Sequence, residues 1–272
     1  MPHYGAQPPA DTLLLVVEIG NTTASIAVFR GDECLEVHKV LSETISTDEG
    51  FARQVAPVIM NYPLLHDAAL CSVVPSLDMV AGASLRRYLA GEVVAVTSGL
   101  QLPFTLHYDS PDSFGADRIA LCAQGHRLYP EEAVIALDIG TAITVDVLGS
   151  NRHYLGGLIL PGLDLMARSL HQHTARLPLV SPVLPDSLVG CSTADCIRNG
   201  IIWGCVSGID GVVMKIKRWL IEQHNEESIR VIATGGNAPL IAGLLDSSPV
   251  LDELAVLKGT SYLFSLNSLS SR

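Results

Sequence analysis

The chain has 272 residues, of which 48% are apolar and 17% are charged, and its formal net charge is −11. This apolar content suffices for a sizeable core and excludes a disordered chain. The acidic balance, with no cluster of Lys and Arg, argues against direct contact with nucleic acid.

The N-terminal segment and the cysteines bear on where the chain works. Residues 1–11 are rich in Pro and Ala, and we expect a loose tail there. The first apolar run, Leu13–Val17, is far shorter than a secretion signal or a membrane span. None of the six cysteines stands in a Cys-x-x-Cys or a zinc spacing. These features favour a cytoplasmic chain with reduced thiols and no membrane contact.

The first predicted elements are a strand, a glycine turn and a second strand. The run Leu13–Val17 suits a buried strand and ends in the turn Glu18-Ile-Gly-Asn-Thr22. Ala24–Phe29 then predicts the second strand. Beyond it we expect strands at Cys34–Val40, Ala69–Val74 and Val93–Thr97, and helices at Asp48–Asn61 and Ser76–Ala90.

An Asp-Arg pair precedes the next predicted helix. Gly115–Arg118 comes directly before Ile119–Leu128. Free N–H groups and the macrodipole at a helix start favour anions. Arg118 can hold a carboxylate there with two hydrogen bonds, and Asp117 can accept the proton of an attacking hydroxyl. The alternative is a helix cap plus a surface ion pair, which needs no function.

The strand–turn–strand pattern recurs in the second half of the chain. Val134–Leu137 predicts a buried strand, Asp138-Ile-Gly-Thr-Ala142 a glycine turn, and Ile143–Leu148 the next strand. A further strand is expected at Tyr154–Leu160. One such turn would be an ordinary hairpin, since Gly and Asn are the default turn residues. Two in matching contexts predict two similar lobes, each a mixed sheet with helices.

The residue types in these turns suit a nucleotide. Glycine lets the backbone turn tightly and approach a phosphate. Backbone N–H groups and the side chains of Asn21, Thr22 and Thr141 can donate to phosphate oxygens. Glu18 and Asp138 can each hold a cation or its water shell. We therefore predict that the two turns act on one nucleotide.

Two helices follow in the second half. We expect them at Leu163–Leu177 and Thr193–His224, the latter begun by a capping box at Ser192–Asp195. Glycine lowers helix stability, so a glycine stripe on the long helix indicates close approach of another backbone. The alternative is a kinked or interrupted helix. The stripe consists of Gly200, Gly204 and Gly208, four residues apart.

A glycine turn also ends the last predicted strand. Ile229–Ala233 runs into Thr234-Gly-Gly-Asn237, a junction that can hold a nucleotide base or ribose. For the whole chain we predict a tail at 1–11, an N-terminal lobe at 12–118 and a C-terminal lobe at 119–272.

An ordered series of segments resembles the type III pantothenate kinases, from about Leu13 to Leu263. Gly-Ala-Asp-Arg, followed about twenty residues later by Asp-x-Gly-Thr-Ala and then by Gly-Gly-x-Ile-x-Pro-Gly, is specific to that family. The matching segments are Glu18–Thr22, Ser72–Pro75, Gly115–Arg118, Asp138–Ala142, Gly156–Gly162, Thr234–Gly236 and Leu257–Gly259.

The resemblance implies an α/β fold of two ribonuclease H-like lobes, with mixed sheets flanked by helices. This is the fold of the acetate kinase, sugar kinase and actin-like ATPase superfamily. The resemblance also implies that ATP phosphorylates pantothenate to 4′-phosphopantothenate, the first step of coenzyme A biosynthesis. It further implies Mg²⁺ with ATP, a monovalent cation (K⁺ or NH₄⁺), and a homodimer.

The resemblance also implies roles for single residues. Asp117 resembles the general base, and Asp138 the ligand of the monovalent cation. Thr193 resembles the residue that reaches pantothenate from the partner subunit. The other implied pantothenate contacts are Tyr108, Gly115, Ala116 and Arg118. The implied ATP contacts are Glu18, Ile19, Gly20, Asn21, Thr22, Thr23, Ala24, Ser25, Thr141, Gly235 and Gly236.

One position departs from the family pattern, because the family has Asp where Glu18 stands. The extra methylene can displace a bound Mg²⁺ by about 1 Å, and misplacement on that scale can cost roughly 100-fold in rate. Alternatively, Glu18 holds the ion through a shifted water.

Three functions compete on this sequence. Pantothenate kinase is the leading one. A superfamily kinase with another small hydroxyl substrate is the second, and the segment Gly115–Arg118 counts against it. The third is a non-catalytic regulatory protein on the same fold, which Glu18 favours and the intact Asp117 and Asp138 oppose.

Overall fold

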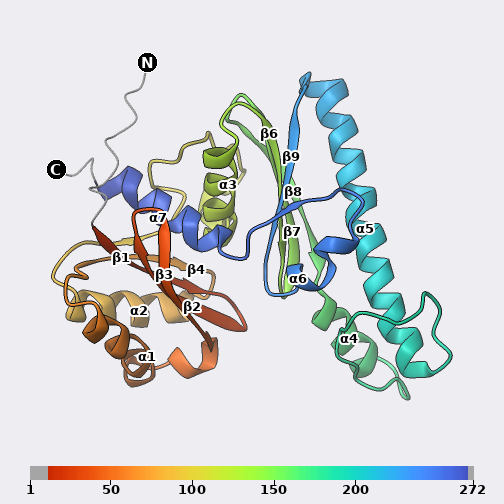
Figure 1. The fold of residues 1–272 in the computed structure, drawn as a ribbon, viewed down its shortest axis with the longest axis horizontal. Helices are drawn as coiled ribbons and strands as arrows, with labels where there is room; N and C mark the ends of the chain where they lie inside the picture. The colour runs from red at the N-terminus through yellow and green to blue at the C-terminus, as the bar shows by residue number, and fades with distance from the viewer. Residues whose placement is uncertain (1–11, 269–272) are drawn as a thin grey trace. The chain divides into compact units, whose positions relative to one another are not determined.

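The computed structural model describes residues 12–268, which form two compact units, each built on one sheet (Figure 1). The first unit extends to Arg127 and takes up the chain again from Leu254, and the second covers the residues between. The tail predicted at 1–11 lies outside the described residues. Within 12–268, no helix has both the length and the apolarity to span a bilayer.

The first unit contains a five-stranded mixed sheet in the order β3-β2-β1-β4-β5. β1 pairs antiparallel with β2 and parallel with β4. The strands are β1 (Leu13–Ile19), β2 (Thr23–Arg30), β3 (Glu33–Leu41), β4 (Asp67–Ser72) and β5 (Val93–Ala95). The helices are η1 (Ser42–Ile45), α1 (Asp48–Asn61), α2 (Pro75–Tyr88), η2 (Pro111–Ser113), α3 (Ala116–Leu128) and α7 (Ala255–Ser268).

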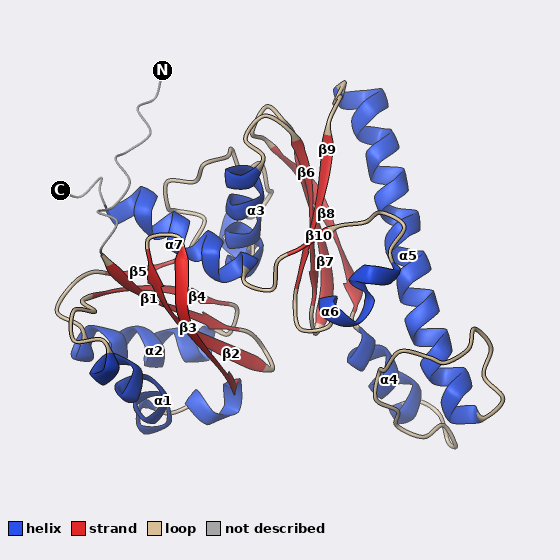
Figure 2. Ribbon diagram, viewed as in Figure 1, coloured by secondary structure: helices blue, strands red, loops and turns tan. Residues whose placement is uncertain are grey.

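Helices cover both faces of the first sheet, as Figures 1 and 2 show. Successive side chains of a strand point to opposite faces, so the continuous apolar run of β1 supplies both. Val17 packs with Phe51 of α1 on one face. Val16 packs with Leu257 and Phe264 of α7 on the other. Each such buried side chain stabilises the fold by about 1.5–3 kcal/mol.

Helices α3 and α7 belong to the first unit, which differs from the predicted lobe boundary at 118/119. The two helices pack closely, since a Cβ on Gly259 would overlap the backbone of Ala120. The Arg127 guanidinium lies 5.0 Å from the ring centroid of Tyr262 and forms an ion pair with Asp32. The C-terminal helix α7 therefore packs on the first sheet through contacts between residues far apart in the sequence, and no local sequence pattern predicts these contacts.

The second unit contains a sheet in the order β10-β9-β6-β7-β8. Its strands are β6 (Ala133–Ile139), β7 (Ala142–Leu148), β8 (Tyr154–Pro161), β9 (Ile229–Thr234) and β10 (Val250–Leu251). Its helices are α4 (Leu163–Gln172), α5 (Thr193–His224), α6 (Ala238–Ile241) and η3 (Ala242–Leu244). The α5 side chains Ile202 and Ile209 pack on Leu137 of β6 in one apolar core.

The two sheets have the same topology. In each, the first strand pairs antiparallel with the second and parallel with the fourth. In each, a bulge interrupts the pairing of the second and third strands, and the extra residue is Leu35 in β3 and Leu155 in β8. The predicted internal repeat and the predicted fold class are thus confirmed.

Helix α5 is continuous over 32 residues, so the alternative of an interrupted helix is wrong. The predicted N-cap is present, with the Ser192 hydroxyl accepting from the Asp195 N–H at 3.1 Å and donating to the Asp195 carboxylate at 2.6 Å. Helix α4 ends at Gln172, five residues before the predicted end at Leu177. Pro178 disfavours helical geometry only at Leu177, so it does not account for the earlier end.

Candidate functional site

The first glycine turn joins β1 to β2 and is fixed by hydrogen bonds within the turn and from Ser42. The Gly20 N–H donates to the Thr23 carbonyl at 2.9 Å and closes the turn. Ser42 holds it from outside: its N–H donates to the Thr22 carbonyl at 3.0 Å and its hydroxyl to the Gly20 carbonyl at 2.6 Å. Asn21, Thr22 and Thr23 remain exposed, so a fixed backbone presents polar groups to solvent.

A row of paired residues crosses the first sheet where β1 ends, and we call it the first acid row: Cys71, Glu18, Ser25 and Lys39. Paired residues share a face of the sheet. Burial raises the pKa of Glu18 to about 7, and the nearby Asp117 carboxylate also raises it. The Lys39 ammonium and a hydrogen bond from Ser25 lower the same pKa. Glu18 thus lies near a second acid, a cation and a donor.

Asp117 lies in the first turn of α3, where its carboxylate accepts the Arg118 backbone N–H at 2.7 Å. The carboxylate lies directly against Gly115, where a Cβ would come within 2.5 Å of Oδ1. Glycine is therefore needed at 115 for this side-chain position. Helix geometry places the acid at the positive end of α3, and its charge raises the pKa of Glu18.

Arg118 is only 8% exposed, which does not match the surface ion pair of the alternative interpretation. Its guanidinium carbon lies 4.4 Å from the ring centroid of Phe114 and 5.9 Å from that of Tyr108. The two rings meet edge to face at 4.9 Å. A cavity of about 410 Å³ lies beside them, lined by His107, Tyr108, Asp109, Ser110 and Ser113. A guanidinium oriented by aromatic rings suits a carboxylate ligand.

In the second unit, three glycine segments converge on the turn after β6. Gly140 N–H closes that turn on the Ala142 carbonyl at 3.0 Å, as Gly20 does in the first unit. Gly162 donates to the Thr141 carbonyl at 3.1 Å and has no room for a Cβ. Gly235 has a φ of +100°, and a Cβ there would overlap the Asp138 carboxylate. The structure therefore brings together the predicted residues Asp138, Thr141 and Gly235, with Gly236 adjoining.

The equivalent row of the second sheet, the second acid row, consists of Thr234, Asp138, Thr144 and Ile159. Asp138 takes the place of Glu18 and Thr144 that of Ser25. The buried Thr144 Oγ1 has no hydrogen-bond partner within the described residues. Ile159 is 65% exposed at the place that Lys39 has in the first row.

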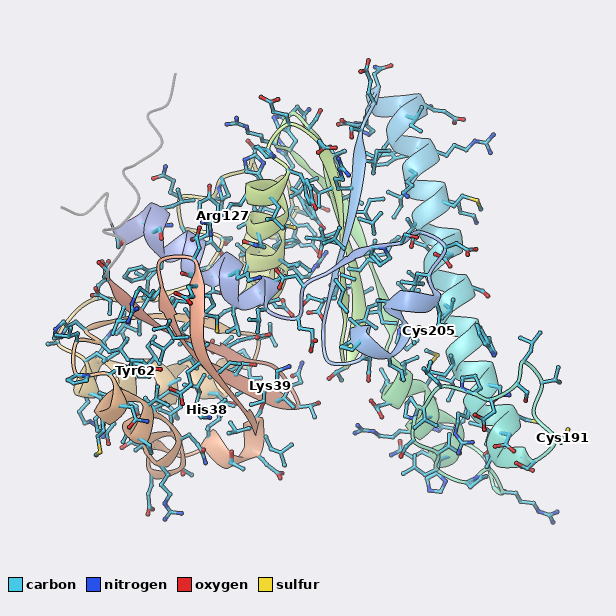
Figure 3. The ribbon with its side chains drawn as sticks, viewed as in Figure 1. His38, Lys39, Tyr62, Arg127, Cys191 and Cys205 are labelled. Atoms are coloured by element: carbon cyan, nitrogen blue, oxygen red, sulfur yellow. The ribbon has the colours of Figure 1, made fainter. Side chains whose placement is uncertain are left out.

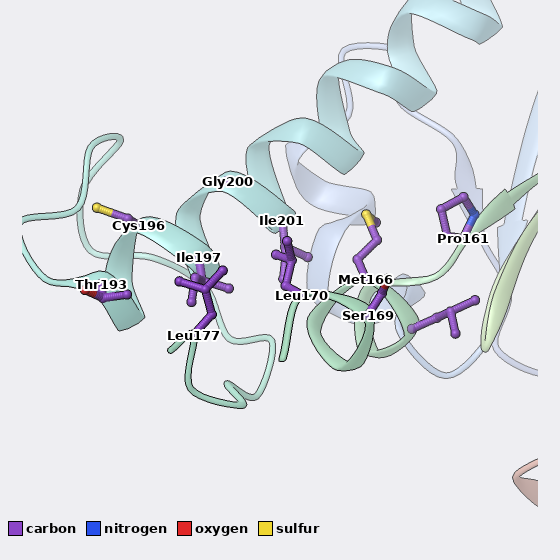
Figure 4. Close-up of a pocket in the computed structure, with 11 residues that line it drawn as sticks. Pro161, Met166, Ser169, Leu170, Leu177, Thr193, Cys196, Ile197, Gly200 and Ile201 are labelled. Carbon is purple, nitrogen blue, oxygen red and sulfur yellow. The ribbon is translucent and has the colours of Figure 1, made fainter. Parts of the chain in front are cut away.

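Thr193 begins α5 and does not belong to either turn. It lines a largely apolar cavity of about 820 Å³ between α4 and α5 (Figure 4). The close-up shows Ile197 of α5 beside Leu177 and Ile201 beside Leu170.

Sequence reasoning missed several residues of these sites. Ser42 and Lys39 lie about twenty residues after the first glycine turn, so its motif does not include them. The pairing of Lys39 with Ser25 also depends on the bulge at Leu35, which the sequence pattern does not reveal. Phe114 carried a usable signal, because it directly precedes the Gly115–Arg118 segment.

Two sheets of one topology, each with an acid before a tight glycine turn, define a two-lobed fold of the sugar kinase and actin-like ATPase class. The model of the family Type III pantothenate kinase matches residues 14–215. The chain belongs to the type III pantothenate kinase family.

Similar proteins agree with this assignment. The chain is 50% identical to the type III pantothenate kinase of Chlorobium luteolum over 262 residues, 96% of this chain and 97% of the relative. Among solved structures, a Campylobacter jejuni protein assigned to the Baf family of transcriptional activators matches with a TM-score of 0.55 at 19% identity, over 92% and 96% of the chains. The ethanolamine utilization protein EutJ of Carboxydothermus hydrogenoformans matches with a TM-score of 0.53 at 12% identity, over 94% and 90%. At these identities the solved structures support the fold alone.

Proposed function

We propose that this chain transfers the terminal phosphoryl group of ATP to the primary hydroxyl of pantothenate, giving 4′-phosphopantothenate and ADP. The observation that carries the proposal is a family match over most of the chain, and in the first unit the Asp117 carboxylate lies near enough to Glu18 to raise its pKa. An ADP-release assay with and without pantothenate tests it. ADP release that pantothenate does not stimulate would favour the regulatory alternative.

Asp117 and Arg118 supply the acceptor side of this reaction. Asp117 accepts the hydroxyl proton as the oxygen bonds to phosphorus, while Arg118, oriented by the rings of Phe114 and Tyr108, binds the pantothenate carboxylate. Phosphoryl transfer depends mainly on positioning and charge, so both residues act on a pre-formed geometry. The fixed turn around Gly20 and the cluster around Asp138 bind the phosphates and the nucleoside.

The residues beside the first turn suit a divalent cation. Glu18 is a partly buried oxygen donor that a bound cation would keep ionised. Within residues 12–268, no group of three or more His, Cys, Asp or Glu side chains is placed to hold a metal. Mg²⁺ commonly needs only one or two carboxylates, with waters and phosphates completing its shell. When bound with ATP, the ion neutralises phosphate charge, and Glu18 is the residue that would hold it.

The second acid row suits a monovalent cation at Asp138. The buried Thr144 Oγ1 needs a partner, and an unpaired buried hydroxyl is costly. K⁺ or NH₄⁺ bound to the Asp138 carboxylate would also give the Thr144 hydroxyl oxygen a partner. Activity that requires K⁺ and fails in Na⁺ alone is the expected result, and full activity in Na⁺ buffer free of K⁺ would contradict it.

The exposed face of α5 supports a homodimer. Cβ atoms added at Gly200, Gly204 or Gly208 would meet nothing within 4 Å, so the stripe does not pack inside its own chain. The adjoining apolar cavity holds Thr193, which in a dimer can reach the partner's pantothenate. Gly204→Glu should give a folded monomer in sedimentation, whereas Gln223→Glu, exposed on the last turns of α5, should stay dimeric. A wild-type monomer at assay concentration would refute the dimer.

We also propose a cytoplasmic location. None of the six cysteines, all within residues 12–268, forms a disulfide, which suits the reducing cytoplasm.

A further inference from the structure

Lys39 owes its place in the first acid row to a bulge. Arg30 pairs with Glu33, and an unbroken ladder from there would set His38 opposite Ser25. The extra residue Leu35 shifts the register by one, so Lys39 pairs with Ser25 instead. A shift of one residue exchanges the two faces of a strand. Figure 3 labels His38 and Lys39 on β3.

The face that Lys39 joins carries Glu18. Ser25 lies between Lys39 and Glu18 in the row, and Asp117 is near enough to Glu18 to raise its pKa. Lys39 is exposed, and among the described residues no ion pair holds its ammonium. His38 on the opposite face contacts Glu36 instead. An exposed ammonium near Glu18, on the strand that pairs with the residues after the first glycine turn, is positioned for an anion.

We propose that Lys39 contacts the terminal phosphate of ATP and is a catalytic residue of the kinase. This rests on the proposed function, which sets the reacting phosphate next to Asp117. A triphosphate entering beside Glu18 and Asp117 meets two carboxylates, and like charges at close range repel strongly. One ammonium with three donors on a flexible stem offsets that repulsion at the phosphate that lies nearest.

The ammonium acts in the transfer step without changing its own protonation. The pantothenate hydroxyl oxygen forms a bond to the terminal phosphorus, and its proton passes to Asp117. The bond from that phosphorus to the oxygen bridging to the middle phosphate breaks, and its electron pair leaves with ADP. Lys39 stabilises the negative charge on the equatorial oxygens of the transferring group.

Lys39→Met should lower kcat/KM for ATP on the order of 100-fold, the effect of removing one preorganised donor. Lys39→Arg should recover part of that loss. Arg53→Met is the matched control, since it removes one exposed positive charge from the same unit. The double variant His38→Lys/Lys39→His keeps the composition of β3 and moves the lysine to the other face, so it should behave as Lys39→Met does.

Binding separates this proposal from the proposed function. In calorimetry with Mg²⁺, Lys39→Met should weaken binding of the β,γ-imido analogue of ATP about tenfold while changing ADP binding less than about twofold. This measurement needs no pantothenate, so it holds even if wild-type protein fails to phosphorylate pantothenate. Equal losses for the analogue and ADP, or an effect no larger than that of Arg53→Met, would overturn the assignment of Lys39 to the terminal phosphate.

Discussion

The two acid rows occupy equivalent places in two sheets of one topology, yet their chemistry differs. The first has Glu18 with Ser25 and Lys39, and the nearby Asp117 carboxylate raises the pKa of Glu18. The second has Asp138 between Thr144 and Thr234, and an isoleucine stands where the first has its lysine. The first row thus gathers opposite charges of the kind that phosphoryl transfer uses, and the second gathers neutral oxygens around one acid. Two equivalent backbone arrangements thus differ in chemistry through a few side chains.

The largest effect should come from changing Asp117, because the second acid row has no counterpart of this residue. Asp117→Asn keeps the size of the side chain and cannot accept a proton, so kcat should fall about 10²–10⁴-fold with ATP binding nearly unchanged. Asp112→Asn, in the exposed η2 helix nearby, is the control. The measurement is kcat per folded active site, with a melting curve to determine the folded fraction. A loss of kcat within about threefold would show that Asp117 is not the general base.

The second effect concerns the pH dependence of stability. The pKa of Glu18 is raised from 4.5 to about 7, so the folded chain binds the proton more tightly than the unfolded chain. Its stabilising contribution is complete below pH 4.5 and is lost as the pH rises through 7. The loss reaches up to about 3 kcal/mol. Glu18→Gln should abolish it and be more stable than wild type at pH 8 in urea unfolding without Mg²⁺.

Glu132 in the second unit serves as a control, because its pKa is shifted in the opposite direction to that of Glu18. The Ser228 hydroxyl and then Arg230 lower the pKa of its carboxyl group. Its contribution to stability is therefore present above the unfolded pKa and lost as the pH falls. Glu132→Gln should be less stable than wild type at neutral pH, and the two variants should converge toward wild type in acid. If the stability of Glu18→Gln and of Glu132→Gln relative to wild type changed with pH in the same direction, both pKa shifts would be contradicted.

A smaller effect tests the packing of the second acid. Gly235→Ala places a side chain at a φ of +100° against the Asp138 carboxylate, and should cost about 1–3 kcal/mol of unfolding free energy. Gly236→Ala is a matched control on the next residue, because a Cβ there meets nothing within 4 Å. Equal melting temperatures for the two variants would show that Asp138 can move away freely.

The smallest effect sharpens the role of the neutral oxygens. Thr144→Val removes the buried, unpaired hydroxyl at nearly constant shape, so it should stabilise the chain by about 1 kcal/mol in buffer without K⁺. It should also remove any rise in melting temperature that K⁺ gives wild type. A destabilised variant with an unchanged response to K⁺ would remove Thr144 from the cation site.

The sequence by itself determined the repeated strand–turn–strand units and the long helix α5, because hydrophobic periodicity and turn glycines are local signals. The family followed from the resemblance of an ordered series of short motifs. The sequence also located Asp117, Arg118 and Asp138 within short motifs. Only the tertiary structure decided that α7 returns to the first sheet and that Leu35 bulges to bring Lys39 beside Ser25. Packing between distant elements and a register shift of one residue depend on contacts far apart in the chain, and no local pattern encodes them.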